Sequence, residues 1–191
     1  MANFWSTTDV EPKRNFRFQV QITGLKGGQD VLWWAKTVTT PSYDVAEVEH
    51  NHLDNKYYFP GRVSWNEISL TMVDPISVDA VRLTNQLVID SGYRVPSGVP
   101  TSPADLSTIS KKKAVTAMGG STGVTTTVLS AVGETIEVWT LNNPFIKSAK
   151  YGDLDYSSDD LRTVEMSIRY DWATCDTSGN NGGPADQFKT V

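Results

Sequence analysis

Residues 68–75 read Ile-Ser-Leu-Thr-Met-Val-Asp-Pro, and the hydrophobic period changes within this stretch. Apolar and polar side chains alternate through the first five positions, which predicts a strand with one buried face. Asp74 and Pro75 then supply a helix N-cap and a first helical residue. The apolar side chains that follow recur at helical spacing: Ile76, Ala80, Leu83 and Leu87. Gly92 stands where a C-cap glycine is expected, so we predict one amphipathic helix over about residues 75–91, covering one face or end of a sheet.

Period-2 alternation recurs elsewhere and predicts a mainly β protein. The further strand-like stretches are residues 16–23, 134–141 and 163–170. Glycines after residue 23 supply a turn, so residues 31–39 are expected to return as the antiparallel partner of the first stretch. The expected fold is a β-barrel or β-sandwich core with one α-helix.

Three kinds of segment do not fit a compact core. Residues 41–61 contain strand-like pieces around a polar middle and predict a long protruding hairpin. Residues 95–132 are rich in Pro, Gly, Ser and Thr and predict a long irregular insertion. Residues 1–14 and 173–191 are expected to form an N-terminal arm and a flexible C-terminal tail, which leaves a single domain over residues 15–172.

The composition narrows the function classes. The 191 residues are 39% hydrophobic and 20% charged, within the globular range. The 17 Lys and Arg against 22 Asp and Glu give a net charge of −5, which argues against a protein that grips nucleic acid by its phosphates. The one cysteine, Cys175, cannot form an internal disulfide, and a reducing compartment fits. No apolar run approaches the ~20 residues of a membrane helix and no signal peptide is visible, so we expect no membrane segment.

Signals for catalysis are weak. His50, His52 and Asp54 would share one face of a strand and could ligate zinc or iron, but an exposed polar hairpin explains them more simply. Residues 119–123 match G-x-S-x-G, yet a strand-forming run follows and both histidines precede the serine, so we expect no nucleophile elbow. We therefore predict a non-enzymatic protein with no metal and no cofactor.

Several segments form a familiar pattern in their order and spacing. They read Asn15-Phe16-Arg17-Phe18-Gln19-Val20, Trp34-Ala35-Lys36-Thr37-Val38, Ile68-Ser69-Leu70-Thr71-Met72-Val73-Asp74, Leu141-Asn142-Asn143-Pro144 and Val164-Glu165-Met166-Ser167-Ile168-Arg169-Tyr170-Asp171. Over about residues 15–172, the chain resembles the tail tube proteins of contractile-tailed bacteriophages. That family is similar in fold to the tube proteins of type VI secretion systems.

The resemblance implies a structural virion protein, the major tail tube subunit. Six subunits would close a ring, and stacked rings would form the hollow conduit for DNA ejection and the template for the contractile sheath. The implied partners are further copies of the chain, the sheath protein, a baseplate or tube initiator, a tail terminator, and phage DNA that passes without specific binding. The protein would assemble in the bacterial host cytoplasm and end in the phage tail. A ring would carry six times −5, or −30, formal charges, which would repel DNA phosphates.

The resemblance also makes the 41–61 hairpin the element that reaches a neighbouring ring. The candidates for contacts between stacked rings are Tyr43, Asp44, His50, His52, Asp54, Lys56 and Tyr57. Glu47 and Glu49 share one strand face and are candidates for the lumen. Three alternatives stay open. One is a baseplate or tube-initiator paralogue that forms a ring without stacking indefinitely. The more remote ones are a carbohydrate-binding β-sandwich module that uses exposed tryptophans and a metal enzyme built on His50, His52 and Asp54.

Overall fold

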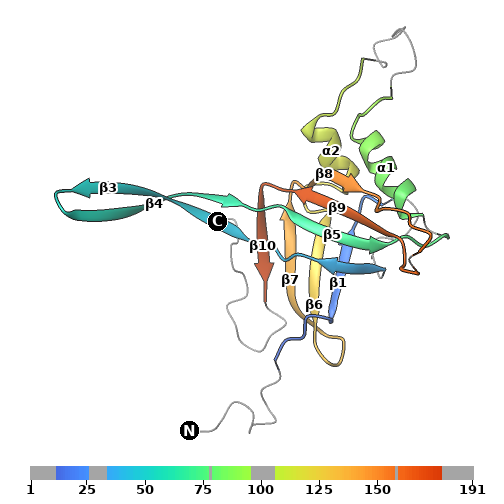
Figure 1. Cartoon of the computed structure of the whole chain (residues 1–191), viewed down its shortest axis with the longest axis horizontal. Coiled ribbons are helices and arrows are strands. Elements are labelled where there is room, and N and C mark those ends of the chain that lie inside the picture. The colour runs from blue at the N-terminus through green and yellow to red at the C-terminus, as the bar shows by residue number, and fades with distance from the viewer. Residues whose placement is uncertain (1–11, 26–33, 78, 96–105, 158, 178–191) are drawn as a thin grey trace.

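The computed structural model describes residues 12–25, 34–77, 79–95, 106–157 and 159–177, so most of the predicted arm and tail lies outside the described residues. Within these residues, two four-stranded antiparallel sheets and a separate hairpin are formed (Figure 1). Sheet A has the order β1 (Phe18–Ile22), β6 (Val124–Leu129), β7 (Thr135–Asn142) and β10 (Trp172–Asp176). Sheet B has the order β2 (Ala35–Val38), β5 (Ile68–Val73), β9 (Thr163–Arg169) and β8 (Phe145–Lys150). The hairpin is β3 (Tyr43–His52) and β4 (Asn55–Trp65).

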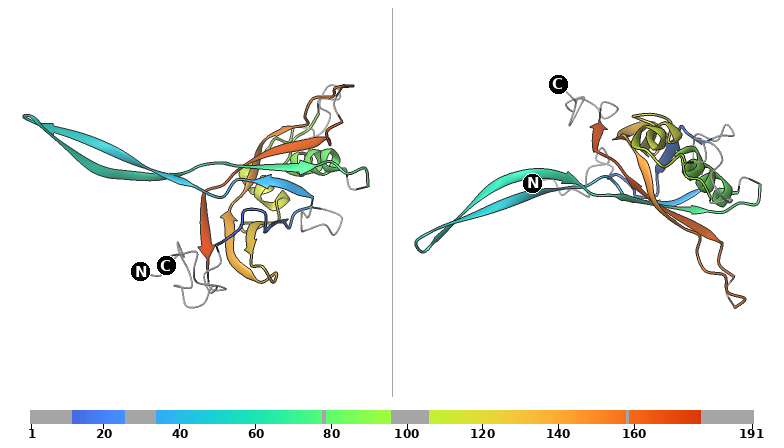
Figure 2. Two further views of the ribbon diagram at one scale, coloured as in Figure 1. Left: turned by 60° about the horizontal axis from the view of Figure 1, so that its bottom comes forward. Right: turned by 90° about the horizontal axis from the view of Figure 1, so that it is seen from above.

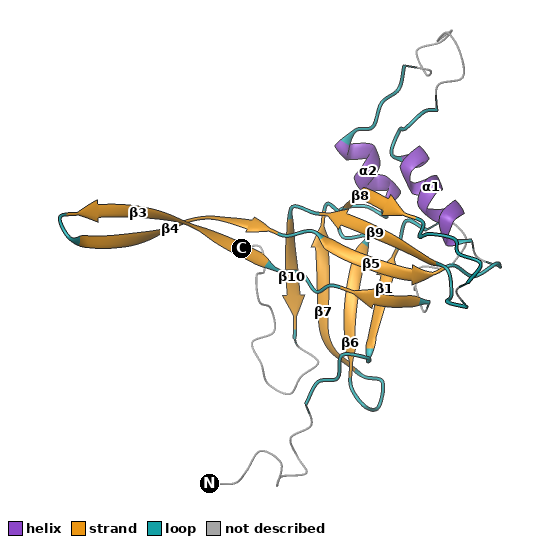
Figure 3. Cartoon of the chain, in the orientation of Figure 1, coloured by secondary structure: helices purple, strands orange, loops and turns teal. Residues whose placement is uncertain are grey.

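Sheets A and B bury their apolar faces in one core, so the fold is the predicted mainly β class with a sandwich-like arrangement (Figure 3). The alternation predicted for residues 68–73 is confirmed, because every second side chain of β5 is buried. The same holds for β9. Helix α1 (Ala80–Asp90) adds Ala80 and Leu87 to this core.

The predicted partner of the first strand is wrong. β1 pairs with β6, in the register Ile22 to Val124, while β2 belongs to sheet B and pairs with β5. Glycine-rich turns predict a nearby partner, but the pairing that forms places both Ile22 and Val124 in the core. Phe16, expected on the buried face of this strand, precedes β1 and is 75% exposed.

Helix α1 confirms the predicted helix but begins later than expected. Its N-cap is Asp79, whose carboxylate accepts the Arg82 backbone N–H at 2.9 Å. Asp74, the predicted cap, also contributes, because its Oδ1 accepts the Ala80 N–H at 2.8 Å. Ile76 therefore lies outside the helix and is fully exposed instead of facing the core. Two carboxylates therefore accept hydrogen bonds from backbone N–H groups at the start of α1, which have no partner within the helix.

The expectation of a long irregular insertion over residues 95–132 is wrong in its second half. A second helix, α2 (Lys111–Ala117), begins there after the N-cap Ser110. The Thr-rich run that follows is β6, an interior strand of sheet A. The boundary predicted at residue 173 is also wrong, because Ala173 and Cys175 are buried in β10. Both stretches look like loops by composition, but alternate side chains reach the core.

Gly92 ends α1 in a conformation that favours glycine. Its φ is +106°, its N–H bonds to the Ile89 carbonyl at 2.9 Å, and the Tyr93 N–H bonds to the Val88 carbonyl at 3.3 Å. These two bonds define a Schellman motif, as the sequence predicted for a C-cap glycine. A Cβ at Gly92 would lie 2.6 Å from the Thr108 carbonyl oxygen, so space is also restricted there.

We expect Gly92→Ala to destabilise the fold more than Gly120→Ala. Gly120 has a similar φ of +95°, but nothing lies within 4 Å of its added Cβ. Gly120→Ala should cost about 1–2 kcal/mol from the left-handed backbone alone. Gly92→Ala should cost at least about 1 kcal/mol more from overpacking. Urea unfolding of both variants checks this, and equal costs would contradict the steric part of the argument.

Candidate functional site

The hairpin of β3 and β4 projects far from the two sheets (Figure 2). Every residue of β3 is exposed, and so is every residue of β4 before Trp65. His52 pairs with Asn55, which leaves Leu53 and Asp54 as a two-residue turn. Such an isolated two-stranded ribbon is marginally stable in water unless something else holds it. The hairpin is therefore expected to depend on its base and on external partners.

Tilted aromatic ring pairs connect the base of the hairpin to the core. The rings of Tyr43 and Trp65 lie 5.2 Å apart at the base, and Trp65 lies 6.1 Å from the ring of the buried Tyr170. Asn66 closes the base, because its backbone N–H bonds to the Ser42 carbonyl at 2.8 Å. Tilted aromatic pairs at these distances contribute beyond the area that they bury. The direction of the hairpin is set by these contacts.

The register divides the outer part of the hairpin, residues 47–60, into two different faces. The charged face carries Glu47, Glu49, Lys56 and Tyr58, with Lys56 Nζ 2.9 Å from Glu49 Oε1. The apolar face carries Val48 opposite Phe59 and His50 opposite Tyr57. Val48 is 61% and Phe59 56% exposed, so nothing within the described chain covers this face.

The turn of the hairpin is unusual. Leu53 is 90% exposed and has a φ of +54°, a left-handed conformation that a leucine rarely adopts. Asn, Asp or Gly would adopt it at lower cost, and a polar side chain would be better solvated. Strain of this kind in an exposed apolar residue points to a contact outside the subunit.

All the residues predicted for ring stacking lie on the hairpin, but they separate into four positions. Tyr43 and Asp44 belong to the base, where Asp44 Oδ2 accepts a hydrogen bond from Asn66 Nδ2 at 2.8 Å. The other candidates lie in the outer part: His50, His52 and Tyr57 on the apolar face, Lys56 on the charged face, and Asp54 in the turn. Glu47 and Glu49 share one face, as predicted.

Sequence reasoning missed the exposed apolar residues Val48, Leu53, Tyr58 and Phe59. Their positions on both sides of a polar turn were visible in the sequence, but the sequence did not show that these side chains stay exposed. The proposed sharing of one face by His50, His52 and Asp54 is wrong, because Asp54 lies in the turn. Among the described residues, no group of three or more His, Cys, Asp or Glu side chains could hold a metal ion.

The tryptophans that the structure describes do not form an exposed row. Trp34 is buried, and Trp65 and Trp139 pack against the core. Trp172 is 38% exposed in β10, while Trp5 and Trp33 lie outside the described residues. This arrangement gives no support to the carbohydrate-binding alternative.

A groove of about 610 Å³ opens beside the base of the hairpin; we call it the base groove. Apolar side chains from four elements or their flanks line it, and charged side chains border it: Trp65, Ile109, Phe145, Tyr170, Lys111 and Arg169. This volume is typical of sites that take a small ligand or a few side chains. The sequence offered no signal for the groove, because its walls come from distant parts of the chain.

Asp171 also lines the base groove and is held by two donors. Lys111 Nζ lies 2.6 Å and Asn143 Nδ2 2.9 Å from Asp171 Oδ2. Burial alone would raise the pKa of Asp171, but the hydrogen bonds from Lys111 and Asn143 lower that pKa below its usual value. The carboxylate therefore stays charged and keeps Lys111 at the border of the groove.

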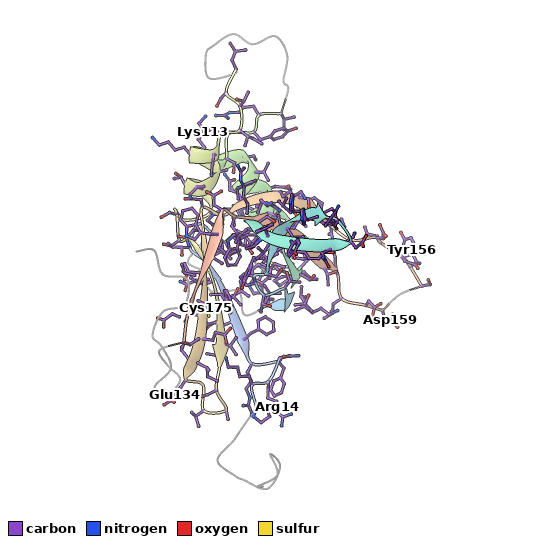
Figure 4. The ribbon with its side chains drawn as sticks, turned by 90° about the vertical axis from the view of Figure 1, so that its left-hand side faces the viewer. Arg14, Lys113, Glu134, Tyr156, Asp159 and Cys175 are labelled. Atoms are coloured by element: carbon purple, nitrogen blue, oxygen red, sulfur yellow. The ribbon has the colours of Figure 1, made fainter. Side chains whose placement is uncertain are left out.

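A second exposed apolar region lies in the loop between β8 and β9. Tyr156 is fully exposed, and Leu154 and Leu161 are largely so. Figure 4 looks along the hairpin and shows Tyr156 and Asp159 at the outer end of this loop, well away from Lys113 and Glu134. The molecule thus presents apolar residues in two separate directions.

The chain is similar in fold to solved components of contractile injection systems. No protein-family model matches it, and no curated protein matches it in sequence. It is similar to the tube-terminating cap of the anti-feeding prophage, with a TM-score of 0.61, 14% identity, and 93% of this chain and 99% of that chain covered. It is also similar to a chain of the extended sheath–tube complex of the extracellular contractile injection system PVC, with a TM-score of 0.56 and 16% identity. That match covers 87% of this chain and 92% of that chain. A chain of the anti-feeding prophage baseplate matches with a TM-score of 0.53 and 14% identity, over 87% of this chain and 96% of that chain.

At these identities the likeness shows the fold, and it is the fold that the resemblance to tail tube proteins predicted. The three solved structures come from a cap, a sheath–tube complex and a baseplate, so the fold alone does not separate these positions. No helix among the described residues is long and apolar enough to cross a membrane.

We expect Trp65→Ala to destabilise the subunit and Phe59→Ala to leave it nearly unchanged. Trp65 packs between two rings at the base, so truncation should cost about 3 kcal/mol of unfolding free energy. Phe59 is exposed, so the same truncation should cost less than about 0.5 kcal/mol. The unfolding free energies of the two variants are measured with a chemical denaturant, under conditions that keep the protein monomeric. A large cost at Phe59 would mean that its side chain is needed by the subunit itself.

The Asp171 carboxylate should make stability depend on pH in the acid range. Because its pKa is lower in the folded state, its stabilising contribution is complete above the unfolded pKa and is lost as the pH falls through the folded pKa. Asp171→Asn should therefore be less stable than the wild type at pH 7, and the difference should be smaller at about pH 3, below the ordinary aspartate pKa of about 3.9. Urea midpoints at both pH values test this, with Asp153→Asn in the exposed β8–β9 loop as the control. A difference of the same size at both pH values would contradict the ionic explanation.

Proposed function

We propose that this chain is a structural subunit of a contractile-tail tube, and specifically the major tail tube subunit of a contractile-tailed phage. Six copies close a ring, and the rings stack into a hollow conduit on which the sheath assembles. The observation that carries the proposal is the projecting hairpin with its uncovered apolar face, on a fold shared with tube and cap components.

The exposed hairpin suits stacking between rings. Large aromatic side chains that are exposed in the free subunit are typical of surfaces that become buried on association. A projecting element that contacts a different surface of the next copy makes a head-to-tail contact, and such a contact generates a filament when it does not close. We assign this role to the outer part of the hairpin, including His50, His52, Asp54, Lys56 and Tyr57.

The edges of the two sheets suit ring closure. In the part of the chain that the structure describes, β1 and β10 are the outer strands of sheet A, and β2 and β8 those of sheet B. Outer strands carry backbone groups that can pair with a neighbouring chain. A closed ring joins such edges between subunits and leaves none free.

The acidic composition suits a DNA conduit. A net charge of −5 in each subunit disfavours adhesion of DNA phosphates to the wall. We keep Glu47 and Glu49 as candidates for the lumen. Glu49 is in part neutralised by Lys56, so Glu47 is the stronger candidate of the two. The further partners proposed are the sheath protein, a baseplate or initiator ring and a tail terminator, in a virion that assembles in the host cytoplasm.

A cap, baseplate or tube-initiator subunit is the second candidate. The likeness to the anti-feeding prophage cap has a TM-score of 0.61 and that to the sheath–tube complex one of 0.56, so neither role is favoured strongly. Negative-stain electron microscopy of the purified protein separates them. Long hollow rods identify the major tube subunit, single rings identify a cap or initiator, and monomers at every concentration and with added initiator would refute both.

Shortening the hairpin should block stacking and spare the subunit. Residues 46–62 are replaced by Asn-Gly, a two-residue turn that joins the cross-strand pair Val45 and Val63. The base stays intact, so we expect a folded protein with a melting temperature within a few degrees of the wild type. Micrographs should show rings or monomers and no rods.

The wild-type protein and the Phe59→Ser variant are the controls for this truncation. Phe59→Ser keeps the hairpin but makes its apolar face more polar, so rods should be fewer or shorter. Rods of normal length from the truncated protein would refute the stacking role of the hairpin.

A further inference from the structure

The turn of the hairpin and the base groove lie at opposite ends of the same ribbon. β4 alone has eleven residues, which at ~3.4 Å each span about 35 Å between the turn and Trp65 in the groove wall. The ribbon is extended, as Figures 1 and 2 show, so the turn cannot reach the groove of its own subunit. A contact between the two is necessarily a contact between two copies.

The two sites are complementary in polarity. The turn presents the strained, 90% exposed Leu53 as a protruding apolar side chain. The groove presents an apolar floor that includes Trp65, Phe145 and Ile109. A leucine inserted there would lose its contact with water and fill part of an open apolar volume, and burial of apolar surface favours association.

The charges of the two sites are also complementary. Residues 47–60 contain Glu47, Glu49 and Asp54 against Lys56, a net charge of −2 with neutral histidines. The groove is bordered by Lys111 and Arg169 against Asp171, a net charge of +1. Opposite charges at the border of an apolar contact set its register and speed the encounter.

We infer that the hairpin turn of one copy docks into the base groove of the next copy. Leu53 packs against the apolar floor, and Asp54 lies beside Lys111 and Arg169 at the border. The contact is heterologous, so each added copy offers a new turn and a new groove, and the chain of contacts continues as a filament. This inference rests on the proposed tube function and names the surface that receives the hairpin.

Cross-linking between two engineered cysteines tests the docking. In a full-length Cys175→Ala background, Leu53→Cys and Ile109→Cys are made in separate subunits, mixed and treated with a short bis-maleimide. Ile109 lines the groove and is exposed, so its cysteine should react. We expect cross-linked dimers from the mixture and little from either variant alone. The double variant should give a ladder of larger species.

A matched control replaces the groove cysteine with Val132→Cys, which is exposed in the turn between β6 and β7. Mixing it with Leu53→Cys should give at least about tenfold fewer dimers, since only docking brings the thiols together. Equal yields would overturn the inference. Cross-linking of Ile109→Cys to Gln187→Cys within one chain would also overturn it, because the groove would then hold the C-terminal segment of its own subunit.

A charge exchange gives a second, independent readout. Asp54→Arg or Arg169→Glu alone should raise the protein concentration needed for rods by about tenfold or more, after each variant is shown to be folded. The combined variant should return to within about threefold of the wild type, since the ion pair is restored in reverse. No recovery in the combined variant would contradict the placement of Asp54.

The outcomes for the docking and for the proposed function are distinct. Wild-type rods without the Leu53–Ile109 cross-link would leave the tube function standing and overturn the docking. Cross-linked dimers from a protein that never forms rings or rods would support the docking and overturn the tube function.

Discussion

The aromatic contact of Tyr43, Trp65 and Tyr170 is the interaction on which the position of the projecting hairpin depends. Tyr170 belongs to the core, Tyr43 to the hairpin, and Trp65 lies between them. A two-stranded ribbon has no core of its own, so its position must come from one end. The same Trp65 also lines the base groove, so the contact that directs the hairpin outward also builds the surface proposed to receive the next one.

Large apolar residues of this chain occur in two settings, one buried in the core and one exposed on the hairpin. Ile68, Leu70 and Ile168 are buried in the core between the sheets, where they stabilise the subunit. Val48 and Phe59 are similar in character but are more than half exposed on the hairpin, outside the core between the sheets, so they contribute little to the stability of one copy. Large apolar side chains that stay exposed in the free subunit are typical of surfaces that are buried on association, which is the basis of the stacking that we propose.

Sequence reasoning succeeded where the period of hydrophobicity decides the structure. The strand over residues 68–73 and the Schellman end of α1 at Gly92 followed from local pattern and backbone preference. It failed where composition suggested a loop, as in β6, and where a nearby glycine turn suggested the wrong partner for β1. Strand pairing is chosen by the core that it buries, and that choice joins residues about a hundred positions apart.

The sequence by itself determined the mainly β class, the presence of α1 and the long hairpin, because alternation, helix caps and polar turns act over a few residues. The tertiary structure alone decided which strands pair, which apolar residues stay uncovered and where the base groove lies. Alternation marks one face of a ribbon as apolar, but only the packing of distant segments determines whether anything covers that face. Val48 and Phe59 stay more than half exposed in the described chain, which is why we include them in the proposed stacking surface of the hairpin.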